Sequence, residues 1–221
     1  MTKSPSNGAV KADDADLSTY LPVWWQRYFT GDLAHFWPPQ LDAKVKDDGS
    51  PVLSRDNVFA IATTNAEHRE LHTAVAAYVW GIGKNAYSIR WMVRAFTRNT
   101  DVVEDKLRLA ASVLENDGPV AAYKAMFRGG EANMKFMGPA YFTKFLFFIG
   151  YKDTAAELRP LILDKRVATA LRKRPDFPLQ PRDGDWPSTV YEQYLTYCRD
   201  QNSDDPEAVE IALFNEGRAR R

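Results

Sequence analysis

Cysteine and long apolar segments are both scarce in this sequence, and each shortage excludes a class of protein. Among the 221 residues the one cysteine is Cys198, so a disulfide framework is excluded and no set of cysteines can hold zinc or an iron–sulfur cluster. The longest apolar run, residues 145–149, falls far short of the ~20 residues of a membrane-spanning helix. We therefore expect a reducing, intracellular setting and no membrane contact.

Neither charge is in excess over the whole chain, because 29 Lys and Arg balance 29 Asp and Glu. Their distribution is uneven: residues 84–174 hold 17 basic and 9 acidic residues, and the remainder is acidic by the same margin. A basic middle region is typical of a surface that binds a polyanion. Within it Arg90, Arg94 and Arg98 recur at helical spacing and form a stripe that suits phosphate groups. The alternative is that these charges are only solvated helix faces.

Strand-like alternation of apolar and polar residues is convincing nowhere in the chain. Apolar residues recur instead at helical spacing, so the sequence predicts an all-α protein of about ten helices. Residues 1–16 lack the apolar core of a secretory signal and are expected to form a disordered tail. Residues 17–221 are expected to form one domain, either a single compact body or two lobes around a cleft. The expected helices cover residues 17–32, 55–66, 67–80, 87–98, 101–116, 120–127, 138–149, 153–158, 164–173, 188–199 and 206–216.

Residues 135–149 have the pattern of a helix–hairpin–helix motif: a short helix, a tight turn around Gly138 and a longer apolar helix. Such a hairpin directs free backbone N–H groups at one point, and the positive end of the second helix adds to them. A DNA phosphate can bind there, which positions the protein without reading the base sequence. Pro139 has no N–H and is excluded as a donor. The expected DNA contacts in the motif are Gly138, Ala140, Tyr141 and Lys135.

Two side chains in and after this motif suit chemistry at a sugar carbon. Lys144 lies among phenylalanines on the second helix, where loss of solvation favours the neutral amine that a nucleophile needs. Asp164 follows the apolar run 161–163 at the start of the next expected helix, where backbone N–H groups favour an ionised carboxylate. From there the carboxylate can stabilise a cationic sugar or relay a proton from the lysine. We expect both groups in one cleft.

The order of glycine hairpin, helical lysine and aspartate twenty residues later resembles the helix–hairpin–helix DNA glycosylases. Within them, GPAYFTKFLFFIG, LILDKRVA and residues 209–214 are similar to a bacterial group of 8-oxoguanine-glycosylase-like proteins. The resemblance implies that the protein flips a damaged nucleotide out of duplex DNA and breaks its glycosidic bond, with Asp164 stabilising the sugar cation. In bifunctional members Lys144 would attack C1′, form a Schiff base and act as an AP lyase.

The resemblance also implies a biological setting. It points to base excision repair, with an oxidised purine such as 8-oxoguanine as substrate and double-stranded DNA as partner. It implies a monomer in the bacterial cytoplasm, associated with the nucleoid, and no metal or other cofactor.

The hairpin departs from the family pattern in one respect. The usual second glycine is Ala140 here, and the usual lysine position corresponds more nearly to Phe142 than to Lys144. Two residues on a helix are about 200° apart, so these two positions cannot face one site. Either the hairpin is longer or Lys144 is not the nucleophile, with Lys135 as the next candidate. Three alternatives to a bifunctional enzyme stay open: a monofunctional glycosylase, a non-catalytic DNA-binding protein, and an N-glycosidase acting on RNA or free nucleosides.

Other residues could extend the site. Gly81, after Trp80, could let a flipped base approach the backbone, with Lys84 on a phosphate; the alternative is an ordinary helix end. Phe214 could stack on the base, the alternative being a place in the core. Lys165 and Arg166 are expected to contact phosphates, and Asp185 and Glu210 are undecided candidates for a hydrogen bond to a base edge.

His68 and His72 are four residues apart on an expected helix, a spacing at which two histidines can share a metal ion. No third ligand stands at a suitable spacing in the sequence. We therefore interpret the pair as ordinary surface or half-buried residues and expect no metal site.

Overall fold

The computed structural model describes residues 17–42, 51–152, 157–175, 177 and 184–218. Over these residues the chain forms ten α-helices, two 3-10 helices and one pair of two-residue strands, which confirms the all-α class. None of the described helices combines the length and the apolar character needed to cross a membrane. The tail expected over residues 1–16 lies outside the described residues.

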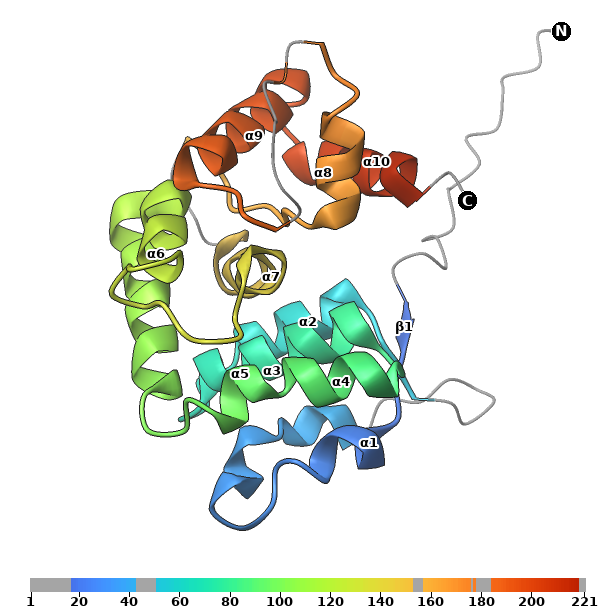
Figure 1. Cartoon of the computed structure of the whole chain (residues 1–221), viewed down its shortest axis with the longest axis vertical. Helices are drawn as coiled ribbons and strands as arrows, with labels where there is room; N and C mark the ends of the chain where they lie inside the picture. The colour runs from blue at the N-terminus through green and yellow to red at the C-terminus, as the bar shows by residue number, and fades with distance from the viewer. Residues whose placement is uncertain (1–16, 43–50, 153–156, 176, 178–183, 219–221) are drawn as a thin grey trace, which may run out of the picture.

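Figure 1 shows two groups of helices with α7 between them. The lower group contains β1 (Ser18–Thr19), α1 (Pro22–Gln26), η2 (Gly31–Phe36), η3 (Pro39–Asp42), β2 (Val52–Leu53), α2 (Arg55–Ala62), α3 (Arg69–Ile82), α4 (Ala86–Met92) and α5 (Arg94–Thr97). The two strands pair antiparallel, with Ser18 opposite Leu53 and Thr19 opposite Val52. This pairing ties the first described residues to the start of α2.

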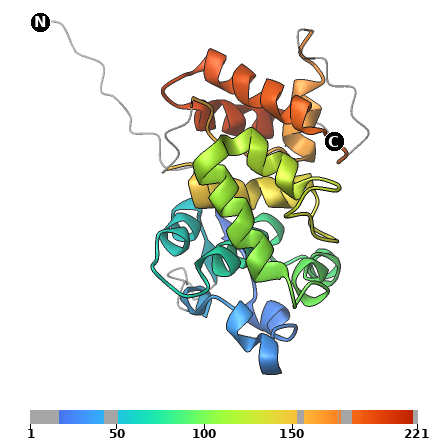
Figure 2. The same ribbon diagram turned by 90° about the vertical axis from the view of Figure 1, so that its left-hand side faces the viewer.

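The upper group contains α8 (Lys165–Leu171), α9 (Ser188–Gln201) and α10 (Pro206–Arg218). Two further helices join the groups, α6 (Val103–Met126) and α7 (Pro139–Gly150). Figure 2 shows α6 running along one side of the molecule from the lower group to the upper. It bends at Gly118, whose φ of 84° and ψ of 177° are not helical. The two helices expected over residues 101–116 and 120–127 are therefore the two halves of α6.

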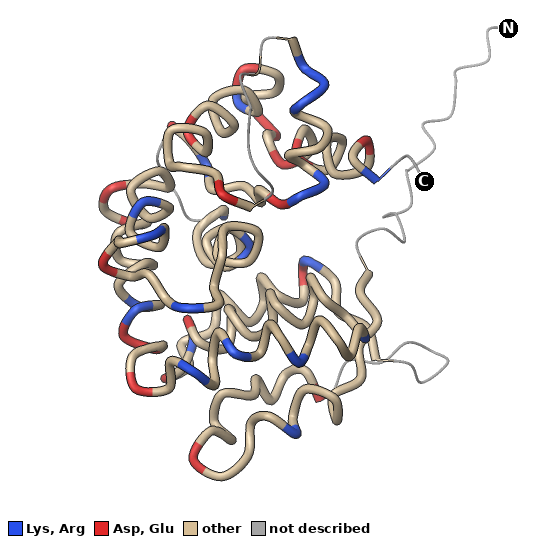
Figure 3. The backbone as a smooth tube through the Cα atoms, in the orientation of Figure 1, with Lys and Arg blue, Asp and Glu red and all other residues tan. Residues whose placement is uncertain are grey.

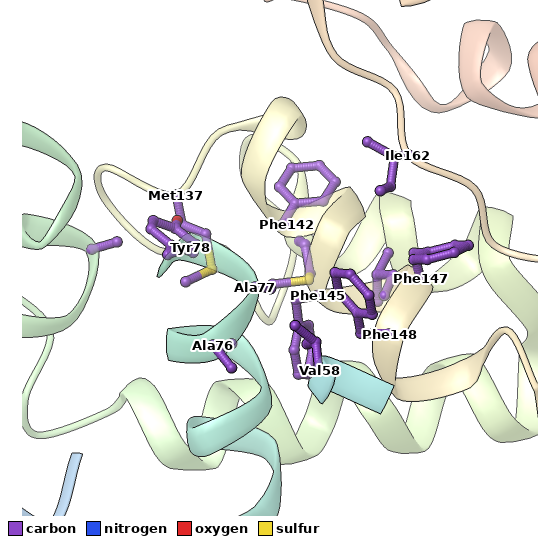
Figure 4. Close-up of a cluster of buried hydrophobic side chains, with 14 of the residues drawn as sticks. Val58, Ala76, Ala77, Tyr78, Met137, Phe142, Phe145, Phe147, Phe148 and Ile162 are labelled. Atoms are coloured by element: carbon purple, nitrogen blue, oxygen red, sulfur yellow. The ribbon is translucent and has the colours of Figure 1, made fainter. Parts of the chain in front are cut away.

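The core is built around α7, which is apolar on every side. Nine of its twelve residues are buried, as expected for a helix without a polar face. Figure 4 shows its phenylalanine rings beside Val58 of α2 and Ala77 of α3, and the ring centres of Phe147 and Phe148 lie 5.2 Å and 5.1 Å from that of Phe59 in α2. Each fully buried ring of this size contributes up to about 3 kcal/mol of hydrophobic free energy. The placement of α7 in the centre of the molecule therefore follows from its composition.

The helix expected over residues 17–32 is wrong for most of its length. Ser18 lies in β1, and α1 covers only Pro22–Gln26. Gly31 has a φ of 58°, which ends any helical continuation. The tertiary pairing of β1 with β2 outweighs the weak helical preference of this segment.

Two other expected helices differ at their bounds. The helix expected over residues 87–98 is divided between α4 and α5 at Val93. Of the helix expected over residues 153–158, the first four residues lie outside the described residues, and Glu157 and Leu158 are not helical.

The first half of the expected helix–hairpin–helix motif is also wrong. Residues 127–138 form a loop between α6 and α7, and Lys135 lies in a turn of this loop rather than in a short helix. Earlier in the loop only glycine fits at position 130, because a Cβ there would lie 2.2 Å from the Ala125 carbonyl oxygen. Phe136 has a positive φ of 68°, which a helix does not allow. The second helix of the motif starts at Pro139, as expected.

Candidate active site

Residues 160–163, which have no regular secondary structure, lead to Asp164, and buried side chains form hydrogen bonds with their backbone. The Tyr191 hydroxyl accepts a hydrogen bond from the Leu161 N–H at 3.1 Å and donates to the Leu161 carbonyl at 2.9 Å. Tyr194 donates to the carbonyl of the next residue, Ile162, at 2.9 Å. The described strands pair only with each other, so these tyrosines of α9 take the place of a neighbouring strand.

Thr143 attaches the same segment to α7. Its buried hydroxyl donates to the Pro139 carbonyl at 2.7 Å and accepts from the Leu163 N–H at 3.2 Å. Thr143 precedes Lys144 and Leu163 precedes Asp164 in the sequence. One hydroxyl therefore fixes the position of the aspartate relative to the lysine.

Asp164 is the N-cap of α8, as the sequence predicts. Its Oδ1 accepts hydrogen bonds from the backbone N–H groups of Arg166 at 2.9 Å and Val167 at 3.1 Å. Its other oxygen, Oδ2, lies 3.4 Å from Lys144 Nζ. The helix end thus orients the carboxylate, and one oxygen stays directed at the lysine.

Lys144 is the one charged residue of α7, and its side chain is 8% exposed. Its Nζ donates to the Ala140 carbonyl at 2.8 Å and lies 5.8 Å from the centre of the Tyr141 ring. A Cβ added to Gly81 would lie 3.0 Å from Lys144 Cε. The missing side chain at Gly81 therefore makes room for the lysine to pass α3.

Lys144 and Asp164 lie on the wall of a cavity of about 290 Å³ between the two groups of helices. The wall contains six residues predicted from the sequence, which are Lys144, Asp164, Arg166, Trp80, Gly81 and Phe214. It also contains Leu17, Ser18, Arg55, Ile162 and Glu210. The volume is close to the ~300 Å³ at which small-ligand pockets begin. Both groups of helices therefore contribute to one site.

The cavity answers the question of which residue of α7 faces Asp164. Residue 144 reaches the aspartate, whereas Phe142 packs in the core with its ring 4.8 Å from that of Tyr123. Lys135, the other candidate, is exposed in the loop before α7 and is not part of this wall. Of these three residues, Lys144 is therefore the one that lies beside Asp164.

A buried ion pair in the cavity wall joins the lower helices to α10. Arg55, the first residue of α2, donates to Glu210 at 2.9 Å and to Glu207 at 2.8 Å. Burial raises the pKa of Glu210, and the charge of Arg55 opposes this rise. The second carboxyl oxygen of Glu210, Oε1, is buried and has no hydrogen-bond partner among the described residues. Because this oxygen has almost no accessible surface, a ligand in the cavity reaches it only if neighbouring side chains move.

Sequence reasoning left Glu210 undecided and missed Arg55. A signal for Glu210 exists, because the buried residues of α10 are Pro206, Glu210 and Leu213, which share one helix face. An acid on a buried face is rare unless it has a partner. The signal for Arg55 is weaker: it follows the N-cap Ser54, and a cation in the first turn opposes the helix dipole.

The two aromatic residues of the wall are already partly covered. The Arg166 guanidinium lies 4.7 Å from the centre of the Phe214 ring. The Arg55 guanidinium lies 5.1 Å from the ring of Trp80, which also meets Phe148 edge-on at 5.4 Å. A base that stacks on Phe214 would use its other face or displace Arg166.

The backbone donors expected at the hairpin are reduced from three to two. The Tyr141 N–H already donates to the Gly138 carbonyl at 2.9 Å within the first turn of α7, so the expectation for Tyr141 is wrong. Gly138 and Ala140 are the remaining candidates. Gly138 lines a second hollow of about 380 Å³ together with Arg128, which pairs with Asp185 at 3.1 Å. Asp185 is therefore away from the cavity that contains Lys144.

The other basic candidates lie on the surface outside the cavity wall. Lys84 is exposed in the turn after Gly83, which ends α3 with a φ of 63°. Lys165 is exposed at the start of α8. Arg94 lies 4.5 Å from the Trp91 ring and 5.0 Å from the Phe136 ring. Figure 3 shows acidic and basic residues mixed along α6, so the basic middle region does not give this helix a face of one sign.

Comparison with known protein families supports this architecture. The family model described as "Putative 8-oxoguanine DNA glycosylase OGG-like protein" matches residues 14–214. The match covers most of the chain and every residue of the cavity wall, and the protein belongs to this family. Neither the curated proteins nor the solved structures contain a match to the chain.

Proposed function

We propose that the protein is a DNA glycosylase that removes an oxidised purine, 8-oxoguanine first, from duplex DNA and then cleaves the strand with its own lysine. The observation that carries this proposal is the 3.4 Å approach of Lys144 Nζ to Asp164 Oδ2 on the wall of a cavity of about 290 Å³. The family match supplies the DNA-repair context. The cavity is placed to receive a nucleotide flipped out of the helix.

Asp164 first prepares the lysine and then stabilises the sugar. In the resting protein Lys144 Nζ donates to the Ala140 carbonyl and to Asp164 Oδ2. Transfer of a proton toward Asp164 frees the nitrogen lone pair for attack. As the glycosidic bond lengthens, positive charge grows on C1′ and its ring oxygen, and the nearby carboxylate stabilises this charge.

The covalent steps balance without a cofactor. The Lys144 nitrogen forms a bond to C1′ while the bond from C1′ to the purine breaks, and the purine leaves with the bonding electrons and takes up a proton. A proton then moves from the lysine nitrogen to the ring oxygen, the sugar ring opens and an imine forms. Loss of a proton from C2′ expels the 3′ phosphate, and water releases the lysine.

Glu210 is the proposed contact for the edge of the purine. Its Oε2 accepts from Arg55, whereas Oε1 has no partner among the described residues. Guanine offers an acceptor at N7, whereas 8-oxoguanine carries a hydrogen there. An ionised Glu210 can only accept a hydrogen bond at Oε1. It therefore favours the oxidised base, which donates from N7, over normal guanine, whose N7 has no hydrogen.

Duplex binding is proposed to depend on the backbone N–H groups of Gly138 and Ala140. The expected cationic contacts are Lys135, Lys165 and Arg166. Such contacts release counterions, so the affinity for duplex DNA should fall steeply with salt.

The test is borohydride trapping on duplex DNA that contains 8-oxoguanine. The wild type is expected to form a covalent complex, and Lys144→Gln to form none, because only an imine is reduced to a stable link. Lys135→Gln is the matched control, since it removes a lysine of the same region that lies outside the cavity; at saturating protein it should trap like the wild type. Asp164→Asn should slow both trapping and base release by about 10² or more.

Other outcomes separate the alternatives. Base release that persists in Lys144→Gln and is lost in Asp164→Asn would indicate a monofunctional glycosylase. Salt-sensitive duplex binding without cleavage of any lesion would indicate a DNA-binding protein. Release of base from free nucleosides or RNA with little affinity for duplex DNA would indicate an N-glycosidase. Unchanged turnover in both variants would mean that this cavity is not the active site.

A further inference from the structure

All three histidines of the chain lie close together, and none of them lines the cavity. The three imidazole rings form a row. The ring centres of His35 and His68 are 4.8 Å apart, and those of His68 and His72 are 5.7 Å apart. Glu104 lies beside the first two. The residues come from η2, the start of α3 and the first turn of α6, elements in the lower part of Figure 1. Folding rather than sequence spacing therefore brings them together.

The donor atoms already have the spacing of a metal site. His35 Nε2 lies 3.2 Å from Glu104 Oε1, and His68 Nδ1 lies 2.9 Å from Glu104 Oε2. One ligand atom from each residue lies within 4.8 Å of the others. Ligand atoms about 2.0–2.2 Å from a tetrahedral ion are about 3.4 Å from one another. Small side-chain rotations would therefore place all three donors around a single ion.

We propose that His35, His68 and Glu104 form a binding site for a divalent transition-metal ion, with Zn²⁺ as the natural first probe. Two imidazole nitrogens and one carboxylate oxygen suit zinc and its neighbours in the periodic table. Calcium and magnesium prefer a shell of oxygen ligands, which this set does not supply. The His35 side chain is 42% exposed, so an ion can enter from solvent and keep water in its fourth position.

His72 acts as a positioning residue for this site. It is buried, and its Nε2 lies 2.9 Å from the His35 carbonyl oxygen, to which it can donate. This hydrogen bond holds the backbone of the first ligand against α3. The sequence spacing of His68 and His72 is thus misleading, because the partners of His68 are His35 and Glu104.

One neighbouring positive charge opposes the binding of a metal cation at this site. Arg108 Nη1 lies 3.8 Å from Glu104 Oε2. Its side chain is 52% exposed and also pairs with Asp105, so the guanidinium can turn away without losing every partner. A bound ion would then link η2, α3 and α6, which lie up to 69 residues apart in sequence, and would stabilise the lower helices.

The experiment is a zinc titration of the full chain after treatment with a chelator, in competition with a chromophoric chelator. We expect one equivalent of Zn²⁺ to bind. His35→Ala and Glu104→Gln should each weaken binding by more than the ~10–100-fold that loss of a second-shell partner costs, and His72→Gln by about that factor. Zinc at a hundredfold excess over its dissociation constant should raise the melting temperature of the wild type by roughly 5–10 °C.

Glu115→Gln is the matched control, because it removes an exposed acid from the same helix. It should bind zinc like the wild type. His35 is exposed, so His35→Ala keeps the test valid even if His68→Ala does not fold. Absence of stoichiometric binding, or equal binding by the wild type, His35→Ala and Glu104→Gln, would overturn the proposal. The titration does not measure glycosylase activity, so its failure would leave the proposed function untouched.

Discussion

Lys144 is a charged side chain on a helix that is otherwise apolar, and this placement has a cost in solvation. The ammonium has two acceptors, at 2.8 Å and 3.4 Å, which compensate part of that cost. A lysine with only a structural role could point to solvent at the end of its flexible stem. Here the stem passes Gly81 to reach the cavity instead, as the proposed role of nucleophile requires.

Gly81→Ala is expected to impair the lyase step without unfolding the protein. The added methyl would lie 3.0 Å from Lys144 Cε, so the lysine must shift by a few tenths of an ångström. Misplacement of a reacting group by 1 Å can cost 10²-fold, and we expect the trapping rate to fall about tenfold. Alanine favours helix over glycine, so the melting temperature should not fall.

Gly138→Ala is the control for that substitution, because a Cβ at this glycine would meet no atom within 4 Å. It retains the backbone N–H and should trap at the wild-type rate. If the Gly81→Ala protein is stable and traps DNA at the wild-type rate, the close packing of the lysine stem against α3 does not affect the trapping step.

Glu210 predicts a pH dependence of stability with a definite sign. Its pKa in the folded protein is raised above the ordinary 4.5 by burial, with Arg55 opposing the rise. The folded state therefore holds this proton more tightly than the unfolded state does. As the pH rises above 4.5, the wild type should lose stability relative to Glu210→Gln until the folded carboxyl has ionised.

Melting temperatures of the wild type and Glu210→Gln between pH 4 and pH 8 give this difference directly. Asp164 and Glu207, which also face Glu210, are present in both proteins and cancel to first order. A wild type that gains stability over Glu210→Gln as the pH rises would mean that the pairing with Arg55 outweighs burial.

At the scale of single residues, the neighbouring sequence was enough to predict Lys144 and Asp164 as residues of the candidate site. Asp164 as an N-cap and Lys144 on an apolar helix follow from neighbouring residues alone. Tyr141 was expected as a backbone donor, but the first turn of α7 uses its N–H. Arg55, His35 and Glu104 could not be predicted because their partners lie in other elements, and a single sequence carries no distances between elements.

Among the elements, the segment 160–163 is the one whose position matters most. It has no neighbouring strand among the described residues, and three hydroxyl groups hold its backbone. Its apolar side chains, Leu161, Ile162 and Leu163, are buried. A buried segment outside helices and sheets is stable in one position when its backbone N–H and C=O groups have hydrogen-bond partners.

Tyr194→Phe and Thr143→Val should each lower the free energy of unfolding by about 1–3 kcal/mol, because each leaves a buried backbone group of the segment unpaired. Thr143→Val should also slow trapping more than Tyr194→Phe does, since Thr143 joins the helix that carries Lys144 to the residue before Asp164. Urea denaturation and borohydride trapping measure the two effects.

Tyr87→Phe is the control, because Tyr87 is 74% exposed and its change should stay within about 0.5 kcal/mol. If Thr143→Val and Tyr194→Phe slowed trapping equally, the effect would come from general stability rather than from the position of Asp164.

The elements were predictable where the pattern is strong and local. The long helices α3, α6, α9 and α10 follow from apolar periodicity, and α7 from its start at Gly138 and Pro139. The expected start of the helix over residues 188–199 is also found, with Ser188 as the first residue of α9. The helix expected over residues 17–32 failed because β1 obtains its stabilisation from β2, which lies more than 30 residues later. Such tertiary pairing outweighs local preference and leaves little trace in the segment itself.

For the whole molecule, the ion pair of Arg55 with Glu210 links the two groups of helices across the cavity. Both side chains are buried, at 10% and 1% exposed. Removal of one partner from a buried pair leaves an uncompensated charge and typically costs about 3–5 kcal/mol. The pair therefore holds the two walls of the cavity in a fixed position relative to each other.

Arg55→Met is expected to lower stability by about that amount, and the double variant Arg55→Met/Glu210→Leu to recover part of the loss. Asp105→Asn breaks the exposed pair with Arg108, whose side chains are 77% and 52% exposed, and should cost less than about 1 kcal/mol. Chemical denaturation of the four proteins gives the comparison. Equal losses for Arg55→Met and Asp105→Asn would show that the buried pair does not join the two groups.

The most direct test of the central claim is to find which residue carries the covalent link to DNA. The borohydride-trapped complex on an 8-oxoguanine duplex can be digested with nuclease and protease and mapped by mass spectrometry. We predict the reduced sugar adduct on Lys144, in the peptide that contains residues 139–150. An adduct on Lys135 or any other lysine, or no adduct under conditions in which the base is released, would contradict the account.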